Sequence, residues 1–123
     1  MFTQTFREKY AADGHSIACT VNGFDCIATL HHDSDTTPQE CGMPDDAVQS
    51  WNNGEWQYVG VAVTIYKNGI RLTGDYDNAL WGVECNYPDS DNSYLRDVAN
   101  ELLSEAIEQA KNVIATLCER ATS

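Results

Sequence analysis

Two runs of β-forming residues with alternating polarity lie near the start of the chain, on either side of Asn22-Gly23. Asn-Gly is the pair best suited to a two-residue type I′ turn, so residues 15–31 are predicted to form a β-hairpin. The register of this turn places Val21 opposite Phe24. One face of the hairpin is then apolar and is predicted to face the core: Ile17, Cys19, Val21, Phe24, Cys26, Ala28 and Leu30.

Residues 56–67 give the strongest strand pattern of the chain. Alternate positions on one face are the aliphatic residues Val59, Val61, Val63 and Ile65. The other face carries Trp56, Tyr58, Thr64 and Tyr66. Because both faces need cover from water, this strand is predicted to lie in the centre of a sheet.

A second Asn-Gly pair, Asn68-Gly69, turns the chain back through residues 70–72 and places Leu72 opposite Ile65. After a polar turn, residues 79–85 are predicted to form a short strand. Its residues on one side are Ala79, Trp81, Val83 and Cys85. Strands that follow one another so closely are typical of an antiparallel meander.

From about Ser93 the apolar period becomes helical, and residues 93–119 are predicted to form one long helix. Its stripe consists of Leu95, Val98, Leu102, Ile107, Val113, Ile114 and Leu117. The chain is therefore predicted to be a single α+β domain over residues 1–123. Its antiparallel meander sheet has about five strands, with the C-terminal helix packed on one face.

Residues 32–50 contain acids, threonines and prolines but few large apolar side chains, and they are predicted to form a long acidic loop. The loop belongs to a larger imbalance of charge. The chain has 19 Asp and Glu against 7 Lys and Arg, a net charge of -12, and no Lys or Arg lies between Lys9 and Lys67. Such a field repels nucleic acid and anionic membranes and attracts basic partners, although net charge also favours solubility on its own.

The five cysteines form no C-x-x-C pair, and their odd number leaves at least one thiol unpaired. The sequence shows neither a signal-peptide pattern nor an apolar run long enough to cross a membrane, so a cytoplasmic protein with reduced thiols is expected. The hairpin register places Cys19 opposite Cys26 in a hydrogen-bonded pair. The wide Cα separation of such pairs favours two buried thiols over a disulfide.

The acids of the segment Asn86 to Leu95, N-Y-P-D-S-D-N-S-Y-L, are spaced like ligands of a calcium loop. A calcium loop is nevertheless excluded, because Tyr94 occupies the position of the turn glycine and Asn100 that of the bidentate glutamate. Asp91, Asn92 and Ser93 are all good N-cap types directly before the predicted helix. A helix cap with spare carboxylates is therefore the simpler interpretation.

The sequence contains few of the residue patterns that a catalytic site requires. His31, His32, Asp33 and Asp35 offer metal ligands near a strand end, but adjacent strand residues point to opposite faces. There is no G-x-S-x-G motif, no phosphate-binding glycine loop and no cysteine beside a histidine in sequence. We therefore predict a non-enzymatic protein without metal or other cofactor, and keep a metal-dependent enzyme as an alternative.

Trp51 and Trp56 follow the acidic loop directly, so aromatic area and negative charge come close together there. Aromatic residues at a polar margin are common in protein interfaces. Trp56, at the start of a strand, is more typical of a core residue. We therefore include Trp51, and not Trp56, in a candidate binding surface.

Three stretches carry a resemblance to a known group of proteins: W-x-x-G-E-W-Q-Y-V-G-V at residues 51–61, L-W-G-V-E at 80–84, and N-Y-P-D-S-D-N-S-Y-L-R-D-V-A-N-E-L-L at 86–103. They resemble a family of short, acidic, uncharacterised proteins of tailed bacteriophages and prophages, over residues 2–110. The resemblance implies a mobile-element setting and brings no established activity or site residues. Small acidic phage proteins of this character resemble anti-CRISPR and anti-restriction inhibitors, which occupy the nucleic-acid grooves of host proteins.

The sequence thus predicts a phage accessory protein that inhibits or modulates a basic, nucleic-acid-binding host protein and does not bind nucleic acid or membranes itself. Carboxylates spaced like phosphates would pair with the basic residues of the groove. The predicted partner-binding residues are Asp33, Asp35, Glu40, Asp45, Asp46, Trp51, Asp89 and Asp91. An alternative is a homo-oligomeric structural or assembly module, a homodimer for example, because the long helix carries more apolar surface than one sheet covers.

Overall fold

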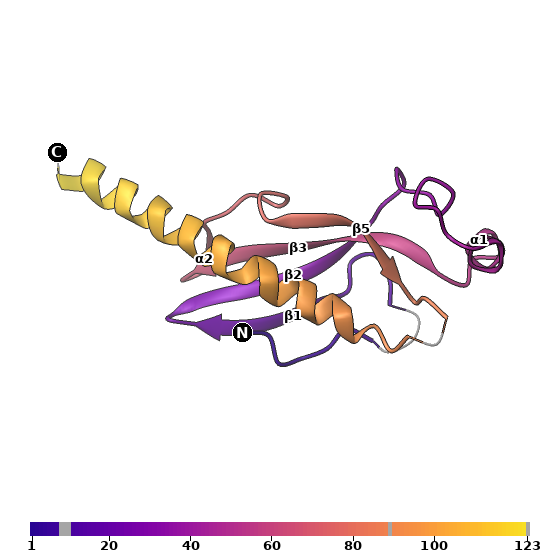
Figure 1. Ribbon diagram of the computed structural model, residues 1–123. Coiled ribbons are helices and arrows are strands. Elements are labelled where there is room, and N and C mark those ends of the chain that lie inside the picture. Colours follow the sequence, from indigo (N-terminus) through magenta and orange to yellow (C-terminus); the bar gives the residue numbers. More distant parts are fainter. Residues whose placement is uncertain (8–10, 89, 123) are drawn as a thin grey trace.

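The computed structural model describes residues 1–7, 11–88 and 90–122, with side chains as far as residue 118. A five-stranded antiparallel sheet carries one long helix on one face, as Figure 1 shows. The elements in chain order are β1 (Ser16–Val21), β2 (Phe24–His32), α1 (Asp45–Asn52), β3 (Gln57–Lys67), β4 (Ile70–Arg71), β5 (Ala79–Cys85) and α2 (Ser93–Thr122). The predicted α+β class is confirmed.

The hairpin of β1 and β2 has the predicted register, with Val21 opposite Phe24 and Cys19 opposite Cys26. Asn22 and Gly23 both adopt positive φ angles, 51° and 82°, as a type I′ turn requires. The predicted apolar face is buried or half-buried against α2. Cys19 is half-buried rather than buried, and its thiol and that of Cys26 are free.

Strand β3 lies in the centre of the sheet, as predicted from its two covered faces. It pairs with β2 along one edge, and with both β4 and β5 along the other. The strands β4 and β5 are therefore two parts of one returning strand, interrupted by the loop of residues 72–78. Leu72 donates its backbone N–H to Ile65, which confirms the register predicted for this turn.

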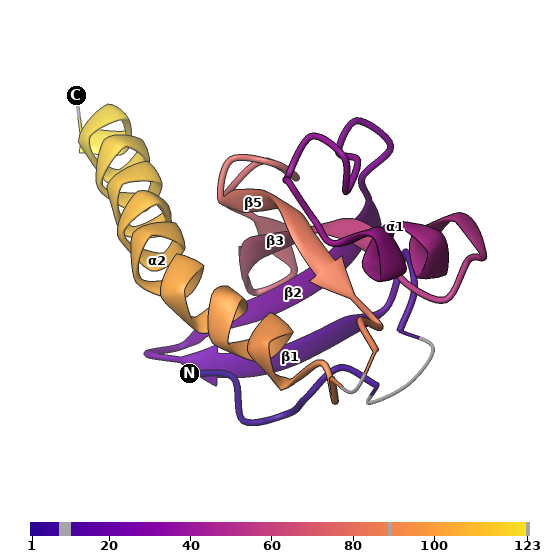
Figure 2. The ribbon, with the colours of Figure 1, turned by 45° about the vertical axis from the view of Figure 1, so that its right-hand side comes forward.

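Helix α2 covers the face of the sheet that carries Val59, Val61, Val63 and Ile65, and together they form the main core. The helix residues buried there are Leu95, Ala99, Leu103, Ala106, Ile107 and Ala110. Leu102, which the pattern placed in the stripe, is half-buried. The helix runs past the predicted end at residue 119, and its C-terminal part extends beyond the sheet in both views (Figures 1 and 2). No helix in the described part of the chain is both long and apolar enough to cross a membrane.

The N-terminal segment contributes to the same core, a role that its sequence did not predict. Phe2 and Phe6 are buried there. The backbone N–H of Phe2 donates to Oδ1 of Asn100 at 2.7 Å, and the amide of Asn100 donates back to the Phe2 carbonyl at 3.2 Å. The side chain of one helix residue therefore fixes the beginning of the chain along α2.

The prediction that residues 32–50 form a continuous loop is wrong at both ends. His32 belongs to β2, and α1 begins at Asp45. The helix forms because Ala47 packs against the buried Trp56 and Tyr58, and the indole N–H of Trp56 donates to the Ala47 carbonyl at 3.0 Å. Tertiary packing thus stabilises a segment whose local sequence is a poor helix former. Figure 2 shows α1 at the end of the sheet far from the C-terminal end of α2.

Candidate functional site

Three ring side chains gather on the face of the sheet opposite to α2. His31 comes from β2, Tyr76 from the loop between β4 and β5, and Trp81 from β5. The ring centroid of His31 lies 5.2 Å from that of Tyr76 and 6.3 Å from that of Trp81, and the last two are 5.8 Å apart. We call these residues the aromatic patch. Tyr76 is 60% exposed and Trp81 is 45% exposed, so the patch presents its rings to solvent.

A β-bulge in β5 places Trp81 in the patch. Val83 pairs with Val59, but Leu80 pairs with Val61, so that Trp81 and Gly82 together stand opposite Gly60. Gly82 adopts a φ of +72°, which glycine reaches without strain. The prediction that Trp81 lies on the same side as Val83 is therefore wrong, because the extra residue reverses the alternation.

The absence of a side chain at Gly60 leaves room for the indole to lie across β3. A methyl group at this position would be only 2.4 Å from Cε3 of Trp81. The ring consequently crosses the central strand and reaches His31, which is the cross-strand neighbour of Gly60. The position of the Trp81 side chain therefore depends on the backbone of β3.

The carboxylate of Asp33 fixes the bulge next to Trp81. Its Oδ1 accepts the backbone N–H groups of Asp35 and Thr36, at 2.9 and 3.2 Å. Its Oδ2 accepts the hydroxyl of Thr36 at 2.7 Å and the N–H of Gly82 at 2.8 Å. Burial alone would raise the pKa of Asp33, but the hydrogen bonds from Thr36, Asp35 and Gly82 outweigh it and lower the pKa.

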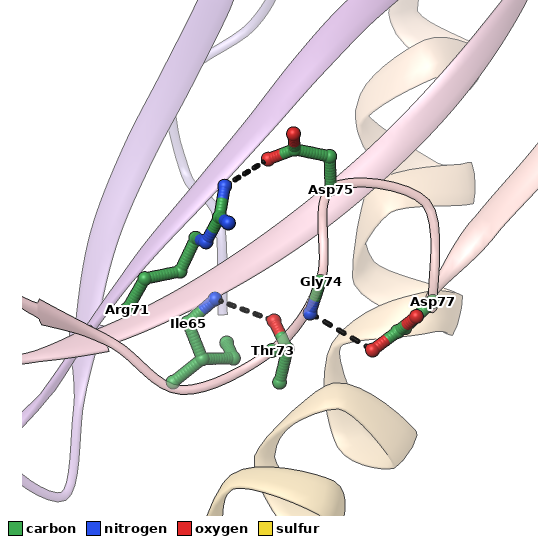
Figure 3. Close-up of polar contacts among 6 residues, drawn as sticks. All are labelled: Ile65, Arg71, Thr73, Gly74, Asp75 and Asp77. Atoms are coloured by element: carbon green, nitrogen blue, oxygen red, sulfur yellow. Dashed lines mark hydrogen bonds and ion pairs between the residues drawn. The ribbon is translucent and has the colours of Figure 1, made fainter.

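The loop that carries Tyr76 is fixed at several points, and Figure 3 shows those around Thr73 and Asp77. The buried hydroxyl of Thr73 accepts the N–H of Ile65 at 3.1 Å, in place of a backbone carbonyl. Oδ2 of Asp77 accepts the N–H of Gly74 at 2.8 Å and the side-chain amide of Gln109 on α2 at 2.9 Å. These bonds, that from Gln109 first, lower the pKa of Asp77. The loop is thus ordered by the helix on one face while Tyr76 reaches the other.

A depression of about 400 Å³ adjoins the patch. Its lining consists of His32, Asp33, Ser34, Asp35, Thr36 and Trp81. Asp35 is exposed, and its carboxylate forms neither a hydrogen bond nor an ion pair with the described part of the chain. Trp81 and Asp35 therefore line the same depression, and Asp35 has an unpaired carboxylate.

The structure distributes the predicted partner-binding residues unevenly. Asp35, Glu40, Asp45, Asp46 and Asp91 are exposed, as a binding surface requires. Asp33 is only 7% exposed and its oxygens are occupied, so its role is structural. Trp51 is half-buried against the cluster of Ala47, Trp56 and Tyr58. Asp89 lies outside the described residues.

The four candidate metal ligands do not converge. His31 packs in the aromatic patch, whereas Nδ1 of His32 lies 2.9 Å from Oε1 of Gln57. The oxygens of Asp33 are occupied by its own loop and by Gly82, and Asp35 is exposed at the depression. Among the residues that the structure describes, no group of three or more His, Cys, Asp or Glu is placed to bind a metal ion.

The segment before α2 caps the helix and also binds the N-terminal segment of the chain. The carboxylate of Asp91 accepts the N–H of Ser93 at 3.0 Å, and this bond lowers the pKa of Asp91. Asn92 is fully buried, and its side-chain amide donates to the carbonyl of Arg7 and to Oδ1 of Asn86. Asn86 in turn contacts both backbone groups of Ala11. The cap interpretation therefore holds for Asp91, while Asn92 joins the beginning of α2 to the N-terminal segment and to the residue after β5.

The aromatic patch was missed because its members are far apart in sequence and none belongs to a motif. The signals that were available are Gly60 in the middle of a strong strand and Gly82 directly after Trp81, since an isolated glycine within a strand pattern often marks a bulge or a close approach. The interpretation of the patch depends on its own geometry, because no known family model, curated protein or solved structure matches the chain.

Proposed function

We propose that the protein is a non-enzymatic binding protein that inhibits or modulates a basic, nucleic-acid-binding host protein, in the manner of phage anti-CRISPR and anti-restriction inhibitors. The observation that supports this most directly is an exposed aromatic patch, fixed in place from several sides, next to the exposed Asp35. Exposed Trp and Tyr residues in rigid positions are typical anchors of protein interfaces. The net charge of -12 favours a partner of opposite sign.

The exposed carboxylates of the acidic stretch suit a groove that normally receives DNA or RNA. Asp35, Glu40, Asp45 and Asp46 belong to one continuous stretch that contains no Lys or Arg. Each carboxylate can accept hydrogen bonds from a groove Arg or Lys and release the counterions that a phosphate would release. In this proposal the protein acts in the host cytoplasm as a competitor of nucleic acid.

Affinity capture from host lysate, washed over a series of salt concentrations and analysed by mass spectrometry, tests this function. A nucleic-acid-binding protein retained in stoichiometric amount at low salt and released as salt rises is the expected result, because exposed ion pairs are screened. The captured partner should also lose its DNA or RNA when the protein is added. Capture of no such protein at low salt would contradict the proposal.

Two triple variants with the same change of charge separate a specific surface from net charge. Replacement of Asp35, Asp45 and Asp46 by Asn removes three exposed carboxylates from the acidic stretch that begins beside the patch. Replacement of Glu101, Glu105 and Glu108 by Gln removes three exposed carboxylates from α2. The first set should weaken capture and the second should leave it intact. Equal weakening would mean that only the overall field attracts the partner.

A second candidate function is a homo-oligomeric assembly module, and the overhang of α2 favours it. Beyond the buried Ala110, Val113 and Ile114 are half-buried and Leu117 is 55% exposed. A shallow groove of about 290 Å³ follows this part of the helix. Light scattering over a range of protein concentrations distinguishes the two functions, since a purely monomeric protein contradicts the assembly module.

A further inference from the structure

Trp81 has the properties of an interface anchor that needs little reorganisation on binding. Its ring is 45% exposed, yet Gly60 lies beneath it and the bulge at Gly82 is tied to Asp33. A side chain that is already fixed loses little conformational entropy when a partner covers it. Trp81 also lines the depression of about 400 Å³ together with the exposed Asp35.

We propose that the aromatic patch is a binding site for an arginine side chain of the partner, whose guanidinium group stacks on the Trp81 indole while Asp35 accepts its hydrogen bonds. This inference rests on the proposed function, because it takes the partner to be a basic protein. It adds the chemical group that the partner must present and the two residues that recognise it.

The charges around the patch favour a cation. Asp35 offers a carboxylate with no partner in the described chain, and the buried Asp33 also lines the depression. Arg71, on β4, is already paired with Asp75 at 2.6 Å. An incoming cation therefore meets an aromatic face and an unpaired negative charge together, which is the arrangement that cation–π and ion-pair recognition share.

The shape of the site favours arginine over lysine. A guanidinium group is planar, stacks on an aromatic face and can bind a carboxylate through two parallel hydrogen bonds. The lysine ammonium is a compact, strongly hydrated charge that gains less from an indole face. An exposed indole and an exposed carboxylate that line the same depression therefore match the flat, forked group better than the point charge.

Stacking of a nucleic-acid base on Trp81 is the competing use of such a ring. Proteins that stack bases combine the aromatic residue with a positively charged groove that follows the phosphates. Here Asp35 is exposed and has no partner in the described chain, Asp75 and Arg71 offset each other, and the chain as a whole carries a net charge of -12. Phosphates are therefore repelled from this face, and a protein side chain is the better match.

The test compares two peptides of equal charge, nona-arginine and nona-lysine, titrated into the full chain at low salt and followed by NMR. Binding to nona-arginine should be tighter, and it should shift the indole N–H signal of Trp81 and the backbone signals of residues 35 and 36. The indole signals of Trp51 and Trp56 should move little. A single-stranded oligonucleotide at the same concentration should leave the Trp81 signal unchanged.

Three variants assign the effect to the patch. Trp81→Ala should lower the affinity for nona-arginine about two- to fivefold, the range of one exposed cation–π contact, and should remove the preference over nona-lysine. Asp35→Asn, at an exposed position that cannot threaten the fold, should also reduce the preference. Asp25→Asn removes an equally exposed carboxylate at the other end of β2 and should leave the preference intact.

The outcomes separate this inference from the function on which it rests. Equal affinity for both peptides, with shifts spread over Glu40, Asp45 and Asp46, would overturn the arginine site and still support an acidic surface for a basic partner. Binding of neither peptide at low salt would overturn both. A shift of the Trp81 signal with the oligonucleotide alone would replace the arginine site with a base-stacking site.

Discussion

The carboxylate of Asp33 accepts a hydrogen bond of 2.8 Å from the backbone N–H of Gly82, 49 residues later in the chain. This bond joins the acidic segment after β2 to the bulge that places Trp81 on the open face of the sheet. Asp33, one of the carboxylates predicted to form the binding surface, is therefore withdrawn from it. Its contribution is to hold the ring and the exposed Asp35 in a fixed relation.

Asp33→Asn is expected to destabilise the fold by about 1–3 kcal/mol. The NH2 group of the asparagine replaces one carboxylate oxygen, so it must face either the backbone N–H of Thr36 or that of Gly82, and two donors then meet without an acceptor. Urea unfolding at neutral pH measures this change. Asp35→Asn is the matched control, since its exposed carboxylate has no described partner and should change stability by less than about 0.5 kcal/mol. Equal stabilities of the two variants would show that the Asp33 bonds carry no net energy.

The pH dependence of stability should identify the same carboxylate. The pKa of Asp33 is lowered in the folded state, so its contribution is fully present above the ordinary Asp value near 4 and is lost as pH falls through the folded pKa. The gap in unfolding free energy between the natural chain and Asp33→Asn should therefore narrow between about pH 5 and pH 2. Asp77 and Asp91, whose pKa values are also lowered, remain in both proteins and cancel in this difference. A gap that stays constant over this range would contradict the assignment.

Asn92 should be among the polar residues most important for stability. Its side chain makes bonds of 2.8 and 2.9 Å to Asn86 and one of 2.9 Å to the carbonyl of Arg7, all in a fully buried position. Asn92→Ala should cost at least about 2 kcal/mol in urea unfolding, because buried groups lose their partners. It should also speed hydrogen exchange in residues 2–7.

Two further substitutions show whether the effect of Asn92→Ala comes from the lost hydrogen bonds. Asn92 has a φ of +63°, so Asn92→Gly keeps the backbone conformation and removes only the amide. It should be less harmful than Asn92→Ala by about 1 kcal/mol. Asn112→Ala, at an exposed position on α2, should be close to neutral. If Asn92→Ala lowers the unfolding free energy no more than Asn112→Ala does, the hydrogen bonds of Asn92 do not stabilise the fold.

The regular parts of this fold were predictable because local chemistry determines them. Asn22-Gly23 and Asn68-Gly69 set two registers, and alternation identified the central strand. The bulge at Gly82 was not predictable in the same way, since one inserted residue reverses the faces without altering composition. Helix α1 was missed because it depends on Trp56, a contact between segments. The patch depends on the bulge, so the outward position of Trp81 could not follow from strict alternation.

The cysteines should differ sharply in reactivity. Burial, together with the neighbouring Cys19, raises the pKa of Cys26 to about 12, and burial raises that of Cys85 to about 11. Both should stay protonated and inert toward iodoacetamide at mildly alkaline pH, because the thiolate is the reactive form. Cys41 and Cys118 are exposed and should be labelled first. Peptide mass spectrometry measures the order, and labelling of Cys26 as fast as Cys41 in the native protein would show that the hairpin opens readily.

The overhanging end of α2 gives a prediction that separates the two candidate functions through stability alone. Leu117 is 55% exposed beyond the sheet, whereas Leu103 is buried beneath it. In a monomer, Leu117→Ser should change the unfolding free energy by less than about 0.5 kcal/mol, while Leu103→Ala should cost about 2–5 kcal/mol through a cavity in the core. Thermal unfolding at several protein concentrations checks both values.

If Leu117→Ser lowers the unfolding free energy more than this, and increasingly so as protein concentration rises, a second copy of the chain covers the overhang, because only association makes stability depend on concentration. That result would favour the assembly module, whereas a neutral Leu117→Ser leaves the aromatic patch as the surface on which function must be sought.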